Sequence, residues 1–175
     1  MTEPSFRAAS LADLPNILEL LTASGLPIAG VEAHVDGFLL AFQEGSLAAC
    51  AGLERYGAAG LLRSVAVATP HRSKGLAQRL VDQLIEIARA DGIESLLLLT
   101  VTKTGYFERY GFQTISRAEV PAAVLNSVQF QGVCHASASV MRLDIHHSEG
   151  IHPGEKGSTQ RRSVDDSINT NAKGR

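Results

Sequence analysis

The hydrophobic residues of this chain change repeatedly between the spacing of helices and that of strands before residue 144. A short strand is predicted at 6–9, and the helix that follows is capped by Ser10 or Asp13 and ends at Gly25. The apolar residues of this helix recur at helical spacing and are Leu14, Ile17, Leu18 and Leu21. The start of the chain is therefore predicted as a strand followed by an amphipathic helix.

Strand patterns dominate the middle of the chain and are interrupted by one long helix. The Glu44-Gly45 pair marks a hairpin turn, and a helix at 75–90 carries an apolar stripe until Asp91-Gly92 stops it. The predicted strands of this region are residues 38–42, 46–54, 61–68 and 95–99. The last of these is continuously apolar, which is typical of a central strand buried on both faces.

Shorter elements complete the pattern. A short helix is predicted at 104–110, strands are predicted at 112–115 and 137–143, and a helical segment at 120–128 lies between these two strands. Strands and helices thus interleave along the whole domain, which predicts an α/β (α+β) fold.

The composition changes abruptly after the last predicted strand. Residues 146–175 are mainly His, Ser, Gly, Lys, Arg, Asp and Asn, with Val164 and Ile168 as isolated apolar residues. Such a segment cannot bury enough apolar surface to offset the entropy of ordering it. We therefore predict one folded domain at 3–144 and a disordered polar tail at 145–175, and we interpret the tail histidines as solvated rather than as a metal site.

Bulk composition excludes several function classes. The formal net charge is -2, aromatic residues make up 5% of the 175 residues, and tryptophan is absent, so nucleic-acid binding is not indicated. No apolar run approaches the ~20 residues of a membrane span, and the N-terminus lacks the apolar core of a secretion signal. The two cysteines, Cys50 and Cys134, are interpreted as buried thiols in a reducing compartment rather than a disulfide. A cytoplasmic protein is expected.

The segment 61–78, LLRSVAVATPHRSKGLAQ, combines a strand, a loop and the start of a helix. Arg72, Gly75 and Ala77 are spaced there as R-x-x-G-x-A. The unpaired amides of a helix N-terminus bind a diphosphate, and Gly75 and Ala77 leave room for its close approach. The G-x-x-x-x-G-K-[ST] and G-x-G-x-x-G nucleotide motifs are absent. The pattern alone leaves two interpretations, a diphosphate site or an ordinary strand-to-helix connection.

This segment, the long helix, the buried strand and YFERYGF at 106–112 together resemble the GCN5-related N-acetyltransferase superfamily. The resemblance covers residues 6–143. It implies a central mixed, mostly antiparallel sheet with helices on both faces, splayed between its fourth and fifth strands. It also implies acetyl-coenzyme A as co-substrate and direct transfer of its acetyl group to a primary amine. Because dimers are common for this fold, a homodimer is expected.

The resemblance also assigns coenzyme contacts. In that family the strand before the loop pairs its backbone with the pantetheine arm, which here implies Val65, Ala66 and Val67, a form of β-augmentation. The loop amides hold the pyrophosphate, and the matching residues are Arg72, Ser73, Lys74, Gly75, Leu76, Ala77 and Gln78. The Lys74 ammonium is expected either to add charge near the phosphates or to be solvated.

Two subgroups of the superfamily are similar to different parts of the chain. LLTVTKTGYFERYGF, with VPAAVLNSVQF and ASASVMRLDI, is similar to the catalytic domain of N-acetylglutamate synthases. AACAGLERYG and LLRSVAVAT are similar to the acetyltransferases of bacterial arsenic-resistance operons, and we favour this second match. It implies a small amino-acid-like amine acceptor and a link to arsenic resistance, with an arsenic- or phosphinate-bearing amino acid as one candidate.

Acetyl transfer to an amine requires removal of a proton from that amine. Glu54 ends the third predicted strand and is our candidate base, acting through a water; the alternative is a solvated glutamate beside Arg55. Many members of the superfamily carry a glutamate at the start of the fourth strand, where this chain has Leu61. The usual assignment of the base therefore does not transfer.

The departing thiolate must also gain a proton or be stabilised otherwise. The superfamily's usual general acid is a tyrosine four residues before the glycine of the final Gly-Phe pair, where this chain has Phe107. Either Tyr106 or Tyr110 substitutes, or solvent supplies the proton. We predict Tyr106 as the candidate acid and interpret Tyr110 as a core residue.

Arg63 interrupts an otherwise apolar strand, and a buried arginine is costly unless it is paired. By strand alternation it shares a face with Leu61 and Val65, unless a bulge near Ser64 intervenes. A guanidinium binds a carboxylate or phosphinate with two hydrogen bonds, so we predict that Arg63 clamps the acidic end of the acceptor. The alternative is an internal ion pair, whose candidate partners are Glu54 and Asp36.

Three other functions stay open at this point. One is an N-acetylglutamate synthase activity. Another is a non-catalytic coenzyme A-binding sensor or partner domain, which the phenylalanine at position 107 keeps open. The last is acetylation of a protein N-terminus or lysine, which needs an open groove that the segment 26–36 would shape.

Overall fold

A computed structural model of the protein describes residues 2–133 and 136–146. From residue 147 onward the predicted polar tail lies outside the described residues, and so does Cys134. No helix in the described part of the chain is long and apolar enough to cross a membrane.

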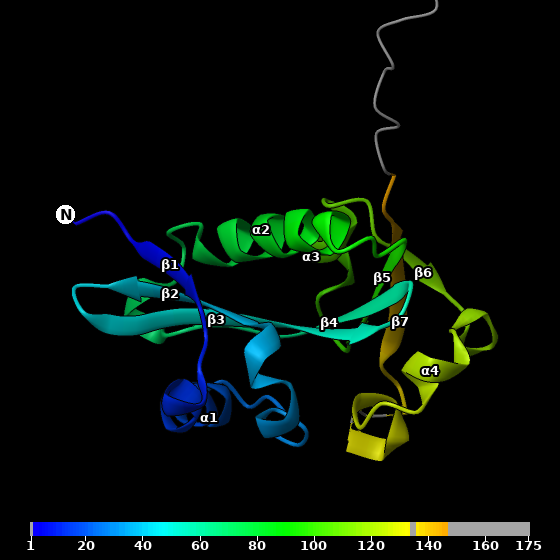
Figure 1. The fold of residues 1–175 in the computed structure, drawn as a ribbon, viewed down its shortest axis with the longest axis horizontal. Helices are drawn as coiled ribbons and strands as arrows, with labels where there is room; N and C mark the ends of the chain where they lie inside the picture. The colour runs from blue at the N-terminus through cyan, green and yellow to red at the C-terminus, as the bar shows by residue number, and fades with distance from the viewer. Residues whose placement is uncertain (1, 134–135, 147–175) are drawn as a thin grey trace, which may run out of the picture.

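Seven strands form one sheet in the order β1-β2-β3-β4-β5-β7-β6 (Figure 1). The strands are β1 Ser5–Ala8, β2 Phe38–Gln43, β3 Ser46–Tyr56, β4 Ala59–Val67, β5 Ser95–Thr100, β6 Gln113–Ile115 and β7 Ser139–Asp144. β4 and β5 pair in parallel, and the other neighbouring pairs are antiparallel. The mixed, mostly antiparallel sheet that the superfamily resemblance implied is confirmed.

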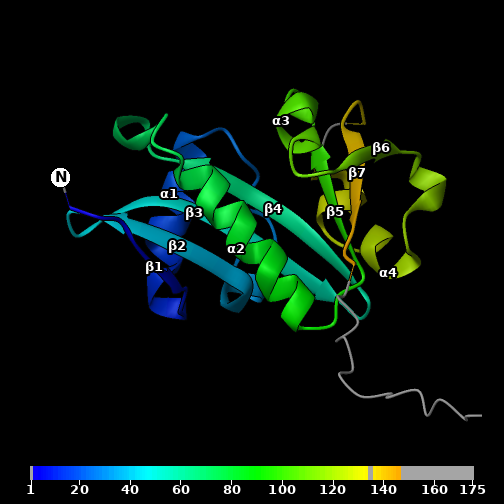
Figure 2. The ribbon, with the colours of Figure 1, turned by 90° about the horizontal axis from the view of Figure 1, so that it is seen from above.

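Helices cover both faces of the sheet. One face carries α2 (Leu76–Ala90) and α3 (Thr104–Glu108), while α1 (Leu14–Ala23), the 3-10 segment η2 (Glu32–Gly37) and α4 (Ala122–Leu125) lie on the other (Figure 1). The shorter turns are η1 Leu11–Asp13, η3 Thr69–His71, η4 Arg117–Glu119 and η5 Gln129–Val133. Seen from above, α2 lies across the sheet between β2 and β4 (Figure 2).

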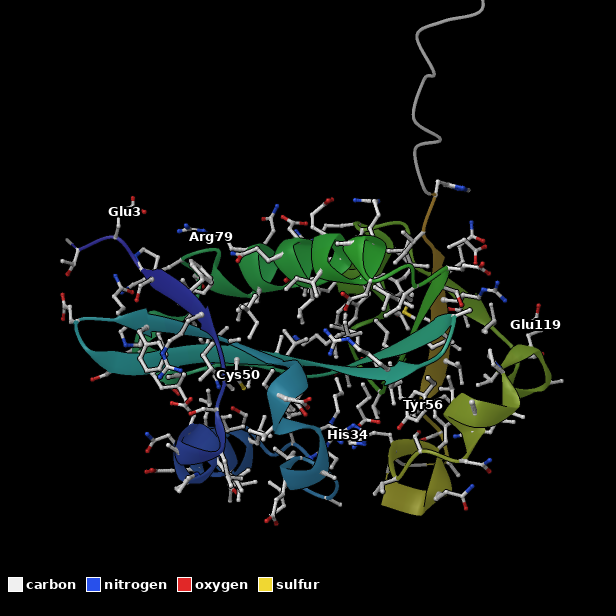
Figure 3. All side chains as sticks on the ribbon, viewed as in Figure 1. Glu3, His34, Cys50, Tyr56, Arg79 and Glu119 are labelled. Carbon is white, nitrogen blue, oxygen red and sulfur yellow. The ribbon has the colours of Figure 1, made fainter. Side chains whose placement is uncertain are left out.

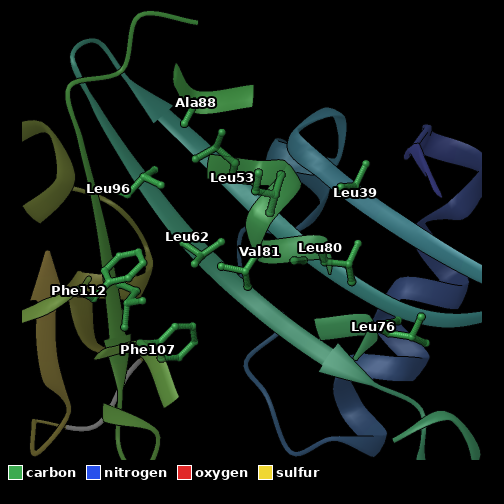
Figure 4. Packing of buried hydrophobic residues seen from close by; sticks show 14 of the residues in the cluster. Leu39, Leu53, Leu62, Leu76, Leu80, Val81, Ala88, Leu96, Phe107 and Phe112 are labelled. Atoms are coloured by element: carbon green, nitrogen blue, oxygen red, sulfur yellow. The ribbon is translucent and has the colours of Figure 1, made fainter. Parts of the chain in front are cut away.

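The apolar stripe of α2 forms the main core with the strands below it. Leu80 and Val81 are fully buried and pack in one cluster with Leu62 of β4 and Leu96 of β5, and Phe107 and Phe112 close its far end (Figure 4). A second cluster lies under α1, and a third lies under α4. The helical spacing read from the sequence thus marks the buried face of α2.

Two predicted boundaries differ from the structure. The turn between β3 and β4 is shorter than predicted because Gly60 belongs to β4, where a Cβ would lie 2.8 Å from Leu96 Cδ2 and 2.9 Å from Leu53 Cδ1. The helical segment predicted at 120–128 is reduced to α4, because Pro121 has an extended ψ of 140° and the helix starts after it. Both differences come from tertiary packing or local backbone geometry that hydrophobic spacing does not report.

The sheet splays open between β4 and β5, as the superfamily resemblance implied. Pairing between these strands covers Ala59–Leu61 and Ser95–Leu97 and stops there, whereas β7 pairs with β5 along Ser95–Thr100. The second half of β4 therefore has a neighbour in β3 but none in β5.

A β-bulge lies in β4 where the splay begins. Ser64 adopts a positive φ of 57°, and the register with β3 shifts between the pairs Gly52–Arg63 and Cys50–Ala66. Because the bulge inserts an extra residue, Val65 packs against the α2 cluster instead of sharing a face with Arg63. The bulge that the sequence left open is therefore present.

Cys50 lies beside this bulge, fully buried, with its Sγ 3.5 Å from the Ser64 carbonyl oxygen. Burial raises the pKa of the Cys50 thiol to about 12. Since the thiolate is the reactive form, we expect Cys50 in the folded Cys134→Ser variant to react with a disulfide reagent at about pH 8 at least ~1000-fold more slowly than in the unfolded chain. Equal labelling rates with and without denaturant would contradict this expectation.

Candidate active site

A cavity of about 1030 Å³ occupies the splay. Its lining comes from the loop after α1, from β4, from the end of β5 with the loop that follows, and from the segment that leads into β7. The segments and single residues are 24–27, 61–67, Arg72, 99–103, Gln129 and Ala138. The gap in backbone pairing and the cavity are therefore the same place.

The predicted pantetheine residues Val65, Ala66 and Val67 line this cavity. The side chains of Val65 and Val67 pack toward the α2 cluster, and that of Ala66 packs toward the α1 cluster, where the residue is 4% exposed. Because β5 does not pair with this half of β4, the backbone groups that face the gap have no strand partner. They can pair with an extended amide-bearing ligand, as an added strand would.

The loop after β4 presents main-chain amides at the start of α2. Gly75 is the N-cap residue and has a left-handed φ of 75°, which favours glycine at this position. In the described part of the chain, the loop and cap hydrogen bonds use none of the amides of residues 73–78. The positive end of the α2 dipole adds to these amides, so the loop is suited to an anion such as a diphosphate.

The side chains of this predicted loop differ in what they can contribute. Leu76 is 2% exposed and belongs to the core, so only its main chain is available. Arg72 is exposed, donates from Nε to the Val67 carbonyl oxygen at 3.2 Å, and borders the cavity. The remaining predicted residues are at least partly exposed and are Ser73, Lys74, Gly75, Ala77 and Gln78.

Glu54 and Arg63 form a buried ion pair. Arg63 Nη1 lies 2.6 Å from Glu54 Oε1, and the two side chains are 2% and 1% exposed. The internal pair with Glu54, which the sequence left as an alternative, is thus present, and the alternative of a solvated Glu54 is wrong. The physical reason is register: Glu54 pairs with Leu61 and Gly52 with Arg63, so the two side chains are diagonal neighbours on one face.

Two further polar residues that the sequence analysis missed join this pair. The Tyr56 hydroxyl donates to Glu54 Oε2, and His34 Nε2 lies 3.8 Å from the same oxygen (Figure 3). Burial raises the pKa of Tyr56, and its hydrogen bond to the Glu54 carboxylate raises it further. Tyr56 follows Glu54 by two residues on the same strand, so strand alternation was a signal for it; His34, in a 3-10 segment, had none.

Tyr106 is not among the residues that line the cavity. Its hydroxyl lies 2.8 Å from that of Tyr110, and both rings pack against the α2 cluster beside Phe107, which is 9% exposed. Burial raises the pKa of Tyr110, as does the hydrogen bond with Tyr106. The structure therefore does not bring Tyr106 together with the cavity residues, and its role as general acid stays a prediction.

The charged residues that line the cavity are all cations. Arg63, Arg72 and Lys103 contribute to the lining, and no carboxylate or imidazole does so among the residues that the structure describes. The same residues hold no cluster of three or more metal-ligating side chains. Such a lining favours ligands that carry negative charge.

Residues 13–112 match the family described as acetyltransferase (GNAT) family. The chain belongs to the acetyltransferase (GNAT) family. The matched range runs from the residue before α1 to the residue before β6, and so contains the splay, the loop after β4 and the Glu54–Arg63 pair.

Among relatives of this GNAT chain is the amino-acid acetyltransferase of Neisseria meningitidis serogroup A, 31% identical over 67% of the chain and 29% of the relative. The amino-acid acetyltransferase of Pseudomonas paraeruginosa is 30% identical over 71% of the chain and 31% of the relative. The chain thus spans about a third of the length of these relatives.

A solved structure with a similar fold is the N-acetylglutamate synthase of Neisseria gonorrhoeae complexed with coenzyme A and N-acetyl-glutamate. Its TM-score is 0.71 and its identity 26%, and the match covers 83% of this chain and 36% of that one. Of the two subgroups that the sequence resembles, these relatives support the N-acetylglutamate synthase type.

Proposed function

We propose that this domain transfers the acetyl group of acetyl-coenzyme A to the amine of a small amino-acid-like acceptor. The observation that carries the proposal is the unpaired edge of β4, which leads along a cationic cavity to the free amides at the start of α2. A flexible peptide-like arm that ends in a diphosphate fits these two features together. The coenzyme A in the related synthase structure supports the same choice.

The coenzyme supplies an acetyl thioester, and the chain's residues bind and orient it. The backbone of Val65, Ala66 and Val67 is available to the pantetheine arm. The amides of residues 73–78 are available to the diphosphate, and Arg72 adds a positive charge beside them. Holding the thioester and the amine in one cavity supplies much of the rate enhancement through proximity.

Glu54 is our proposed acceptor of the amine proton. Its two oxygens bond Arg63 and Tyr56, and Glu54 is buried and not among the residues that line the cavity, so it cannot contact the amine directly, and the proposal requires a water that enters with the acceptor to relay the proton. For the leaving group, a coenzyme thiol has a pKa near the ~8.5 of free cysteine, so protonation by solvent is adequate without Tyr106.

The acceptor class rests on the cations of the cavity. Lys103 lines the cavity and has no ion-pair partner among the described residues, whereas Glu54 offsets the charge of Arg63, so Lys103 is the cation that favours an acceptor bearing a carboxylate. The related enzymes named for amino-acid acetylation support this choice. An acceptor with an arsenic or phosphinate acid group has the same charge and is a narrower form of the proposal.

Two measurements test the proposal. Calorimetry should detect binding of coenzyme A, and release of thiol from acetyl-coenzyme A should rise with at least one amine from a panel of glutamate, other amino acids and phosphinate- or arsenic-bearing analogues. Acetylation of glutamate, with rescue of a strain that lacks its own synthase, would favour an N-acetylglutamate synthase. Binding without turnover on any amine would favour a sensor domain, and no coenzyme binding would reject the proposal.

We also propose a cytoplasmic homodimer. The proposal rests on the frequency of dimers in this superfamily, and light scattering of the purified protein tests the dimer by its mass. A monomer at micromolar concentration would reject it.

A further inference from the structure

Two segments approach each other below the sheet, on the face opposite α2 (Figure 1). One is the loop 27–30 between α1 and η2, and the other is the segment around Val128, between α4 and η5. A Cβ built on Gly30 would lie 3.5 Å from Val128 Cβ and 3.3 Å from Arg63 Nη1. Gly30 and Val128 do not themselves line the cavity, but each lies close in sequence to a residue that does, Pro27 and Gln129, so their close approach brings the two sides of the cavity together.

Arg63 fixes the first of these segments in place. Its Nη2 donates to the Ala29 carbonyl oxygen at 2.9 Å and more weakly to that of Pro27 at 3.4 Å. Nε donates to Ser64 Oγ at 3.0 Å, and Nη1 pairs with Glu54. A planar guanidinium holds several fixed acceptors at once, which a lysine ammonium cannot reproduce. The ion pair with Glu54 therefore orients the Arg63 guanidinium so that its Nη2 faces the carbonyl oxygens of the loop.

We propose that Arg63 is a positioning residue that holds the loop 27–30 close to Val128, and that these two segments, the acceptor wall, restrict the acceptor to small molecules. The proposal rests on the proposed function and names the size class that the same site accepts. It replaces a direct clamp by Arg63 on the acceptor, because the guanidinium donors already bond protein acceptors. A protein N-terminus or a lysine on a protein surface would need this wall to open.

The first test uses Arg63→Lys, which keeps a cation beside Glu54 and removes the donors to the loop carbonyls. We expect the KM of the best small acceptor to rise at least tenfold, while the coenzyme A dissociation constant and the thermal midpoint show that the fold and the coenzyme site persist. An acceptor KM within twofold of the wild type, in folded protein, would overturn the positioning role.

The second test uses Val128→Ala, since Val128 is 42% exposed and its truncation spares the core. We expect the ratio of kcat/KM for a dipeptide over the matching free amino acid to rise at least fivefold. Leu11→Ala, at an apolar residue that is 65% exposed and lies in η1, outside the acceptor wall, is the control and should leave the ratio unchanged. An unchanged ratio in Val128→Ala would overturn the size restriction.

These outcomes are separable from failure of the proposed function. If the wild type transfers acetyl to no amine, the function fails before either variant is compared. If the wild type is active and both variants keep its acceptor KM and its size preference, the function stands and the acceptor wall does not.

Discussion

Replacing Arg63 with alanine is expected to lower the free energy of unfolding by about 3–5 kcal/mol, because it leaves the Glu54 carboxylate buried without its cation. The Glu54 side chain is 1% exposed, so water cannot replace the lost partner at the surface. The loop carbonyl oxygen of Ala29 loses its donor as well. Urea-induced unfolding followed by circular dichroism measures the change.

The matched control removes both charges together. In Glu54→Gln combined with Arg63→Met, no charge is buried, so we expect the double variant to be more stable than Arg63→Ala alone. Recovery should be partial, since the donors to the loop and to Ser64 are still missing. Glu54→Gln and Arg63→Met are also measured singly. If the loss of unfolding free energy in the double variant equals the sum of the two single losses, the ion pair does not carry the effect.

Ala77→Glu is expected to weaken coenzyme A binding by at least about 30-fold. The new carboxylate would lie in the first turn of α2, beside the free amides that we assign to the diphosphate. Juxtaposed like charges cost several kcal/mol, and each 1.4 kcal/mol is a factor of ten in affinity. Isothermal titration calorimetry with coenzyme A measures the change.

Ala77→Gln is the control, because it has nearly the same shape without the charge. It should weaken binding much less than the glutamate does. The first turn of α2 carries no acidic residue, so the glutamate should also stabilise the free protein slightly, by about 0.3–1 kcal/mol through the helix dipole. Equal affinities for the two variants would place the diphosphate elsewhere.

The elements to which we assign the coenzyme could be predicted from the sequence because their signals are local. The apolar residues of the α2 stripe recur every three or four positions, those of β5 are consecutive, and Gly75 directly precedes the first residue of α2. Gly75 in the left-handed region and the free amides after it follow directly from that spacing.

The contacts of Arg63 on the proposed acceptor side of the cavity could not be predicted in the same way, because they join segments that are distant in the sequence. The register of the β3–β4 hairpin places Arg63 beside Glu54. Its hydrogen bond to Ala29 depends on the path of a loop that has no periodic sequence pattern. Sequence reasoning named the ion pair only as an alternative to a clamp. The orientation of Tyr106 was equally undetermined, since a short helix can turn a tyrosine toward a cavity or toward a core.

Strands β4 and β5 pair over only three residues each, so few backbone hydrogen bonds join the half of the sheet from β1 to β4 to the half that contains β5, β7 and β6. A coenzyme arm laid along β4 would supply hydrogen bonds that the missing strand partner does not. Binding of that kind adds to folding stability, by about 2.7 kcal/mol when the ligand is at 100 times its dissociation constant. The melting temperature of the protein should then rise with the concentration of added coenzyme A, and in the cell its lifetime should follow the supply of acetyl donor. A melting temperature that does not change with coenzyme A concentration would refute this.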